Sequence, residues 1–83
     1  MEYFVYILQS EKDGSYYIGH TGNIEKRVNR HNRGRSAYTQ ARMPWKLVYQ
    51  ECFGSKGEAM KREQEIKAQK NRDYILDLVR TSR

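Results

Sequence analysis

The sequence predicts an α/β domain of the α+β type, in which a small, mostly antiparallel sheet is covered by helices. Three observations support this fold class. Two β-branched and aromatic runs flank an Asp-Gly turn, a third alternating run follows near the middle, and helical segments with capping residues follow these runs. The predicted order is β-β-α-β-α-α, without repeats or linkers. Eighty-three residues suit one domain, 1–83, without a second core.

A β-hairpin is expected at the N-terminus. Tyr3–Gln9 is apolar on both faces, as in an internal strand, and a turn signal at Asp13 separates it from a second short strand, Tyr16–His20. Cross-strand partners share a face, so a two- or four-residue loop puts Tyr6 and Tyr17 on one face, whereas an odd loop separates them. Two hydroxyls on one face would form a polar pocket; ordinary aromatic packing is the alternative.

A helix, a polar segment and a third strand are expected next. Thr21 or Asn23 can cap a helix that continues to about Asn32. The segment Ser36–Pro44 is polar and irregular, with room for a short helical turn. The residues Trp45–Phe53 alternate as a strand does.

Two helices are expected at the C-terminal end. Ser55 and Glu58 form a capping box that opens a helix through about Lys70. Residues 71–73 interrupt the helical pattern. The segment Tyr74–Arg80 then predicts a short closing helix.

The charge distribution favours a polyanionic partner. The chain has 16 basic and 10 acidic residues, a net charge of +6, and no acid between Lys26 and Gln50. Seven cations lie in this block: Lys26, Arg27, Arg30, Arg33, Arg35, Arg42 and Lys46. Three aromatic residues are interleaved: Tyr38, Trp45 and Tyr49. Such a block indicates nucleic-acid binding, with a merely solvated basic surface as the alternative.

Cysteine usage and hydropathy exclude several classes of protein. Cys52 is the single cysteine, so no intrachain disulfide can form, and with two histidines it cannot complete a Cys/His zinc site. A free thiol fits the reducing cytoplasm. The longest apolar run, Tyr3–Leu8, is far below the ~20 residues of a membrane helix, and no signal-peptide pattern precedes it.

Charged side chains share the apolar faces of both long helices. On a helical wheel Ile24, Val28 and His31 fall within about 60°, with Arg27 at the edge of that arc. Burying an unpaired cation costs several kcal/mol, so Arg27 either has a partner or extends its head group into water.

The helix that follows Ser55 also has a charged side chain on its apolar face, here an acidic one. Glu63 lies inside an arc bracketed by Ala59, Met60, Ile66 and Lys67. Its neighbours are expected to face outward: Arg62, Gln64 and Glu65. An inward carboxylate needs a cation, a metal ion or a raised pKa. An internal salt bridge, for example with Arg27, and a metal ligand beside a phosphate site both remain open.

Several of these residues together resemble one family. Its first motif is Gly-Ile-Tyr, where this chain has Phe4-Val5-Tyr6, and its second motif is matched fully by Tyr17-Ile18-Gly19. Arg27 and His31 lie on the helix that follows. Further matches are Glu58 to Glu63, then Ile66-Lys67, and His31-Asn32-Arg33-Gly34 with Thr39 and Pro44. From Tyr3 to about Lys70 the chain resembles the GIY-YIG endonuclease domain, in particular its short stand-alone bacterial members. The resemblance implies a central three-stranded antiparallel sheet flanked by helices.

The resemblance also implies a metal site. Glu63 would hold a single Mg²⁺ or Mn²⁺ ion, since hard cations prefer carboxylate oxygen and water. The ion would sit against the scissile phosphate and the leaving 3′ oxygen. Arg27 would stabilise the additional negative charge of the five-coordinate phosphorus.

Roles for the remaining site residues follow from the same resemblance. Tyr6 and Tyr17 would position or deprotonate the attacking water, with Tyr17 as the preferred base and His20 relaying its proton. Nearby cations would lower a tyrosine's pKa from about 10 toward neutrality. His31 would hydrogen-bond the phosphate or a tyrosine. Gly19 would let the backbone pass close to the metal.

The expected function is therefore a metal-dependent endonuclease that hydrolyses nucleic-acid phosphodiester bonds, with DNA rather than RNA as the expected substrate, in DNA repair or recombination. Its phosphate contacts would come from the basic block: Lys26, Arg30, Arg33, Arg35, Arg42 and Lys46. Most members join this domain to a separate DNA-binding domain, so a partner protein that supplies target specificity is expected. A nucleic-acid-binding module of the same fold that cuts little, and a nuclease subunit completed by a partner, are the alternatives.

Overall fold

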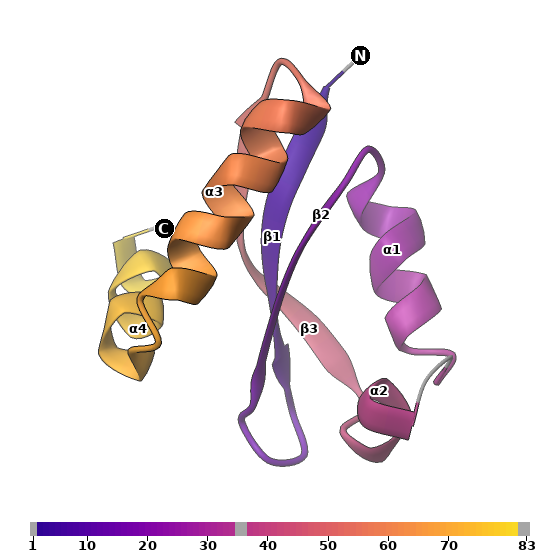
Figure 1. Cartoon of the computed structure of the whole chain (residues 1–83). Coiled ribbons are helices and arrows are strands. Elements are labelled where there is room, and N and C mark those ends of the chain that lie inside the picture. The colour runs from indigo at the N-terminus through magenta and orange to yellow at the C-terminus, as the bar shows by residue number, and fades with distance from the viewer. Residues whose placement is uncertain (1, 35–36, 82–83) are drawn as a thin grey trace.

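The predicted hairpin pairs with a third strand in a computed structural model that describes residues 2–34 and 37–81. The elements are β1 (Tyr3–Ser10), β2 (Tyr16–Thr21), α1 (Ile24–His31), α2 (Ala37–Ala41), β3 (Trp45–Phe53), α3 (Lys56–Ala68) and α4 (Arg72–Thr81). The strands form one antiparallel sheet in the order β2-β1-β3 (Figure 1). The fold class is confirmed, and α2 is the helical turn for which the polar segment had room. None of the described helices is long and apolar enough to cross a membrane.

An even hairpin loop puts the two tyrosines of interest on one face. The N–H of Ser10 donates to the carbonyl of Ser15 at 2.8 Å, which leaves four residues in the loop between them. In the resulting register Leu8 is opposite Tyr17. Because side chains alternate along a strand, Tyr6 lies on the same face as Leu8 and therefore as Tyr17.

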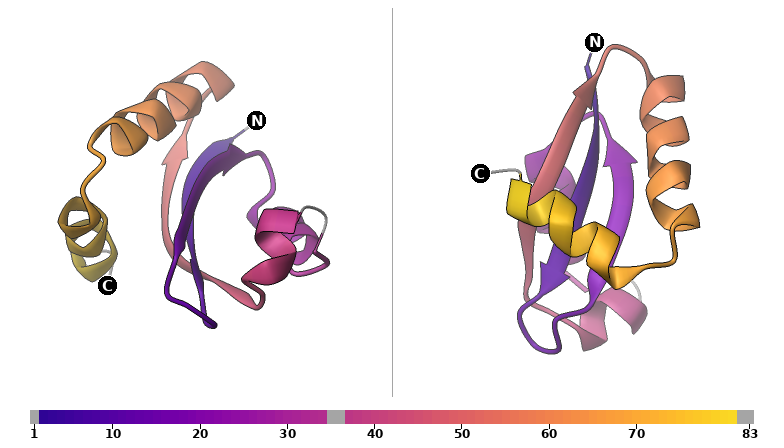
Figure 2. Two further views of the ribbon diagram at one scale, coloured as in Figure 1. Left: turned by 60° about the horizontal axis from the view of Figure 1, so that its bottom comes forward. Right: turned by 90° about the vertical axis from the view of Figure 1, so that its left-hand side faces the viewer.

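Each face of the sheet carries its own helices and its own apolar core (Figure 2). α1 and α2 cover one face, and α3 and α4 cover the other. Beneath α1 and α2 the buried apolar residues are Tyr6, Leu8 and Trp45. Beneath α3 they are Val5, Ala59 and Ile66. β1 lies in the middle of the sheet and contributes to both cores, which explains why its sequence is apolar on both faces.

Two side-chain caps fix where α1 and α3 begin. The side chain of Asn23 accepts from the N–H of Lys26 at 3.0 Å, so Asn23 rather than Thr21 is the cap of α1. The hydroxyl of Ser55 accepts from the N–H of Glu58 at 3.3 Å, as the capping box predicted. Both caps satisfy backbone donors that the helix itself leaves free.

The connection between α3 and α4 is residues 69–71, which is as long as predicted but lies two residues earlier in the chain. Residue Lys70, where α3 was expected to end, instead has φ 47° and turns the chain. The side chain of Asn71 accepts from the N–H of Asp73 at 2.8 Å and so caps the next helix. α4 therefore begins at Arg72 rather than at Tyr74.

The prediction that Arg62 faces outward is wrong. Its Nε donates to both carboxylate oxygens of Glu51 on β3 at 3.1 Å, and its Nη1 donates to the Tyr74 hydroxyl on α4 at 3.2 Å. The hydroxyl of Tyr49 also donates to Glu51. A wheel of α3 alone cannot show this, because the partners approach from two other elements. Arg62 thereby ties α3, α4 and β3 together.

Candidate active site

The ring of Tyr6 lies against Gly19 at the edge of the sheet. β2 is an edge strand, and Gly19 is paired with Tyr6 of the central strand. A Cβ atom at Gly19 would lie 2.6 Å from the Tyr6 hydroxyl and 2.8 Å from its Cζ, which no real side chain tolerates. Glycine at this position therefore leaves room for the Tyr6 hydroxyl against the edge strand. The resemblance implied a different role for Gly19, which was to let the backbone pass close to a metal ion.

Tyr6 and His31 form a buried polar pair. Tyr6 is 1% exposed and His31 is 8% exposed, and the hydroxyl lies 3.3 Å from Nε2 of the imidazole. Burial lowers the pKa of His31, and the charges of Arg27 and Arg30 lower it further. The imidazole is therefore neutral near pH 7 and can accept the proton of the Tyr6 hydroxyl in a hydrogen bond.

The Tyr6 phenol is held in its protonated form. Burial and the neighbouring Tyr17 raise the pKa of Tyr6 to about 12, although the charge and hydrogen bonding of Arg27 act in the opposite direction. For this tyrosine, desolvation outweighs Arg27, so without a bound metal ion the pKa rises rather than falls toward neutrality. Tyr6 is therefore a hydrogen-bond donor at neutral pH rather than a base.

Tyr17 belongs to an aromatic cluster on the same face. Its ring centroid lies 4.4 Å from that of His31 and 6.4 Å from that of Tyr6. Trp45 and Tyr38 flank it at 6.2 and 6.4 Å. Both interpretations of the tyrosine pair therefore hold in part: the rings pack on one another, and the Tyr6 hydroxyl bonds to a polar neighbour.

Glu63 is buried and already has two partners. The residue is 8% exposed, as the helical wheel predicted. Nδ1 of His20 lies 2.6 Å from Oε1, and Nζ of Lys67 lies 2.6 Å from Oε2. Burial alone would raise the pKa of Glu63, but the hydrogen bonds and charges of Lys67 and His20 outweigh it and hold the pKa below its usual value. The internal ion pair exists, with Lys67 rather than Arg27 as its cation.

These residues lie on two faces of the sheet and meet around the edge strand. Tyr17 and His20 are three residues apart, so they point to opposite faces of β2. His20 contacts Glu63 of α3, whereas Tyr17 packs on His31 of α1. The structure therefore does not support a direct proton relay from Tyr17 to His20. In Figure 1, β2 runs between α1 and α3.

Cations of α1 extend from this edge along the surface. Arg27 lines a cleft of about 210 Å³ together with Thr21, Lys26 and Arg30. A second cleft of about 200 Å³ follows, lined by Lys26, Arg30 and Arg33. Because Arg27 also acts on the hydroxyl of Tyr6, it connects the basic surface to the buried part of the site.

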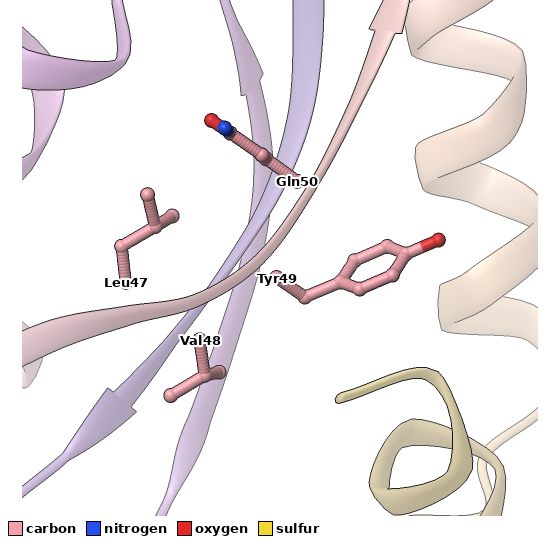
Figure 3. A pocket seen from close by; sticks show the side chains of 4 residues that line it. All are labelled: Leu47, Val48, Tyr49 and Gln50. Carbon is pink, nitrogen blue, oxygen red and sulfur yellow. The ribbon is translucent and has the colours of Figure 1, made fainter. Parts of the chain in front are cut away.

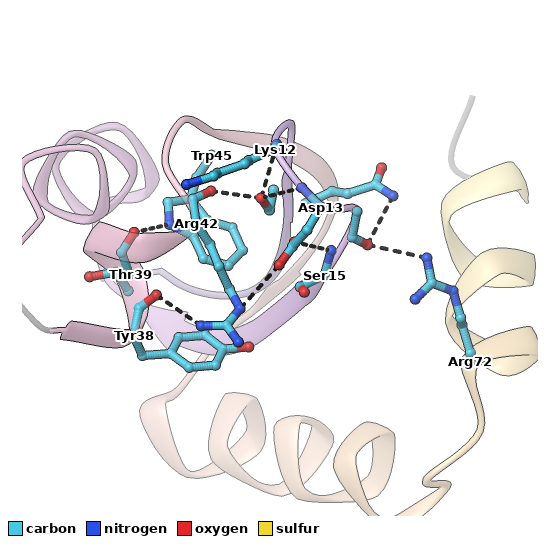
Figure 4. A network of polar contacts seen from close by, with 11 residues as sticks. Lys12, Asp13, Ser15, Tyr38, Thr39, Arg42, Trp45 and Arg72 are labelled. Atoms are coloured by element: carbon cyan, nitrogen blue, oxygen red, sulfur yellow. Dashed lines mark hydrogen bonds and ion pairs between the residues drawn. The ribbon is translucent and has the colours of Figure 1, made fainter.

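Among the described residues, the remaining cations of the basic block do not line these two clefts. Arg42 lies 3.4 Å from a carboxylate oxygen of Asp13, and its guanidinium lies 4.1 Å above the ring of Tyr38 (Figure 4). Part of its charge is therefore neutralised within the fold. Lys46 is exposed on β3. Arg35 lies outside the described residues.

Two of the three interleaved aromatic residues are not surface contacts. Trp45 is 3% exposed, and its Nε1 donates to the carbonyl of Thr39 at 3.0 Å. Tyr49 points toward α3 and α4, away from the face that α1 covers (Figure 3). Only Tyr38, 44% exposed, remains available to stack on a base. The expectation of an aromatic binding surface therefore stays a prediction for Tyr38, whose ring is already in contact with the guanidinium of Arg42.

Lys67 is the site residue whose role the sequence reasoning did not assign. It lies one turn after Glu63 on α3, at the i,i+4 spacing of a helical ion pair. That spacing was a usable signal. The contact of His20 with Glu63 had no such signal, because it joins residues 43 positions apart.

Comparison with known protein families identifies the class to which this fold and site belong. The model of the GIY-YIG catalytic domain matches residues 2–75, so the chain belongs to the GIY-YIG catalytic domain family. Within it, the chain is similar to the UPF0213 proteins. That of Staphylococcus saprophyticus is 52% identical over 67 residues, which are 80% of this chain and 80% of the relative. That of Bacillus licheniformis is 47% identical over 78 residues, covering 90% and 79%.

A solved structure supports the same placement. The solution NMR structure of the UPF0213 protein BH0048 from Bacillus halodurans superposes with a TM-score of 0.62 at 39% identity. The match covers 98% of this chain and 85% of that one. The antiparallel sheet flanked by helices is thus shared with an experimentally determined structure of a similar protein.

Proposed function

We propose that this chain is a metal-dependent endonuclease that hydrolyses DNA phosphodiester bonds at the Gly19 edge of the sheet, in repair or recombination. One observation carries the proposal. A buried carboxylate, Glu63, and the buried pair of Tyr6 and His31 with the half-buried Arg27 beside it flank one edge strand from its two faces. Membership of the GIY-YIG catalytic domain family supports a nuclease-like activity. The cations of α1 favour a polyanionic substrate.

The donor set fits a hydrated hard cation that also binds phosphate. Among the described residues no group of three acidic, histidine or cysteine side chains converges. Mg²⁺ commonly keeps several waters and is held by one or two carboxylates plus substrate phosphate. Glu63 can fill this role once Lys67, whose side chain is 47% exposed, turns away. The bound ion would supply charge neutralisation at the phosphate and at the leaving 3′ oxygen.

The remaining residues account for the other requirements of hydrolysis. A water oxygen attacks phosphorus, the bond to the 3′ oxygen breaks, the attacking water loses a proton and the leaving oxygen gains one from solvent. Arg27 stabilises the negative charge that builds up on the phosphoryl oxygens. Tyr17, acting as its phenolate, receives the proton of the water and becomes the neutral phenol, since Tyr6 keeps its own proton with a pKa of about 12. Tyr6 and His31 position the aromatic cluster and the phosphate.

A nuclease assay with Glu63→Gln tests the proposal. Labelled single-stranded, duplex, flap and branched DNA and the matching RNA are incubated with Mg²⁺, Mn²⁺ or chelator. We expect metal-dependent cleavage of DNA by the parent and none by the variant, with DNA binding unchanged or tighter because a negative charge is removed. Glu65→Gln is the matched control, since Glu65 lies on the same helix with its carboxylate 3.6 Å from Arg62. Equal cleavage by the Glu63 variant and the parent would contradict the assigned role.

One observation favours a second candidate function, a nucleic-acid-binding module that cuts little. Both carboxylate oxygens of Glu63 are engaged at 2.6 Å, by His20 and Lys67, and the carboxylate is satisfied without a metal ion. Under this candidate the parent binds DNA and leaves it intact with every metal. Cleavage that develops only after a cell extract is added would indicate a nuclease subunit completed by a partner protein.

A further inference from the structure

A groove of about 310 Å³ opens between β2, the end of α3 and the start of α4. Its apolar lining comes from all three elements: Tyr16 and Ile18 of β2, Ile66 of α3, and Ile75 of α4. Its size falls at the lower end of the range of small-ligand pockets, about 300–1,000 Å³. We call it the β2–α3–α4 groove. Figure 2 shows α3 and α4 on the face of the sheet opposite α1, and β2 is an edge strand of that sheet.

Cations surround this apolar lining. Lys67, Lys70 and Arg72 all line the β2–α3–α4 groove, and no acidic residue is among the described side chains that do. The guanidinium of Arg72 lies 5.1 Å from the centroid of the Tyr16 ring, so that ring already takes part in a cation–π contact. Apolar side chains beneath several positive charges complement a ligand with a flat apolar part and attached anions. A nucleotide has this chemistry.

The β2–α3–α4 groove is continuous with the candidate active site. Alternate residues of a strand share a face, so Ile18 and His20 lie on the same side of β2, roughly 6.8 Å apart. On α3, Ile66 and Lys67 follow Glu63 by three and four residues and so lie on its face of the helix. Lys67 belongs to both, since it lines the groove and contacts Glu63 at 2.6 Å. A ligand in the groove is therefore a neighbour of the scissile position.

We infer that the β2–α3–α4 groove binds an unpaired nucleobase next to the phosphate held at Glu63. A base inside a duplex is stacked on both faces and cannot enter such a groove, whereas an unstacked base can. The α1 cations lie on the other face of the sheet, so a bound strand crosses the edge of β2 between the two surfaces. The inference rests on the proposed function and deepens it. The preferred substrate is DNA with a single-stranded segment adjoining a duplex.

Binding measured in chelator tests this inference without cleavage. The probes are a blunt DNA hairpin and the same hairpin with a short unpaired tail at its 5′ or its 3′ end, with 2-aminopurine in the tail. We expect one of the tails to tighten binding to the parent by about tenfold, the scale of stacking one base on protein side chains. The fluorescence of the 2-aminopurine should change on binding. Lys70→Glu and Tyr16→Ala should lose the preference and retain affinity for the blunt hairpin.

Lys61→Glu is the matched control for charge, because Lys61 is exposed on the same helix and does not line the groove. It should keep the full preference for the tail. Equal affinity of the parent for tailed and blunt hairpins would overturn the inference and leave the proposed nuclease function standing. Failure of the parent to bind either probe at low salt, both in chelator and with Mg²⁺, would overturn the proposed function, and this inference with it. Circular dichroism of each variant separates loss of binding from loss of fold.

Discussion

Replacing Gly19 by alanine tests the contact on which the site geometry depends. The new Cβ would lie 2.6 Å from the hydroxyl of Tyr6 and 2.8 Å from its Cζ. Tyr6 is 1% exposed and packs in the core beneath α1, so its ring cannot swing into solvent. Either the edge strand or the ring must shift. The hydrogen bond from Tyr6 to His31, 3.3 Å long, would then be strained or lost.

The expected cost can be worked out from opposing terms. Overpacking a core costs about 1–3 kcal/mol. Replacing glycine by alanine at an ordinary backbone conformation returns about 0.4–1 kcal/mol through the unfolded state. We therefore expect a net loss of about 1–2 kcal/mol in the free energy of unfolding. For a domain of this size that lowers the Tm by roughly 5–15 °C.

Thermal and urea unfolding of two alanine variants provides the assay. Gly57→Ala is the matched control, because a Cβ at Gly57, in α3, meets nothing within 4 Å. That substitution should stabilise the domain by up to about 1 kcal/mol, since alanine favours a helix over glycine. A double-mutant cycle of Gly19→Ala with Tyr6→Phe should show coupling of about 0.5–3 kcal/mol. If Gly19→Ala unfolds at the same temperature as the parent or above it, the close-contact argument is wrong.

The other predictions concern turnover, pH and the ion-pair network. Arg27→Ala should slow cleavage about 10²–10³-fold and weaken DNA binding much less. The control, Arg30→Ala, should weaken DNA binding alone. Equal losses in binding and cleavage rate for Arg27→Ala would mean that Arg27 only anchors a phosphate. Tyr17→Phe should lower the rate at least about 10²-fold without changing the fold, and retention of the parent's rate would move the base elsewhere. The pKa of His31 is lowered in the folded state, so as pH falls the unfolded chain binds a proton at this histidine before the folded chain does. The contribution of neutral His31 to the free energy of unfolding is therefore complete above about pH 6.5, the ordinary pKa of histidine, and is lost as pH falls from there toward the pKa of His31 in the folded state. Urea unfolding at several pH values should show this slope in the parent and a weaker one in His31→Gln; equal slopes would contradict the assignment. Arg62→Ala should cost about 1–3 kcal/mol by urea unfolding while the rate at low temperature stays near the parent's, and a large rate loss would place Arg62 in the site.

The alternation of strands and the periodicity of helices predicted much of the site. Loop parity left two arrangements of Tyr6 and Tyr17 open, and the four-residue loop of the structure selects the one in which they share a face. The helical wheel placed Glu63 inward, because that placement depends on local geometry alone. The three-residue spacing between Tyr17 and His20 also implied opposite faces of the strand. The proton relay between them, which the resemblance suggested, did not take this spacing into account. Local patterns thus predicted the direction of Glu63, although the same wheel was wrong for Arg62.

The partners of these side chains could not be predicted in the same way. Glu51 and Tyr74 reach Arg62 from a strand and from another helix, and no wheel of α3 contains that information. The raised pKa of Tyr6 depends on how deeply the ring is buried against Gly19. Such properties arise from packing between distant segments, which the order of residues does not reveal without the fold.

Lys67 neutralises Glu63 in the unliganded site and can also bind the phosphate of a substrate. Its ammonium group lies 2.6 Å from one oxygen of Glu63, while His20 lies 2.6 Å from the other. Phosphate offers Lys67 a competing anion, and the exposed lysine can reach it with little loss of solvation. When Lys67 turns to the phosphate, Glu63 is left with an uncompensated oxygen in a buried position, which favours a cation there. We therefore expect the metal ion and DNA to bind cooperatively at this edge, each weakly in the absence of the other. The reason is that the positive charge of Lys67 repels the metal ion and attracts the phosphates of DNA.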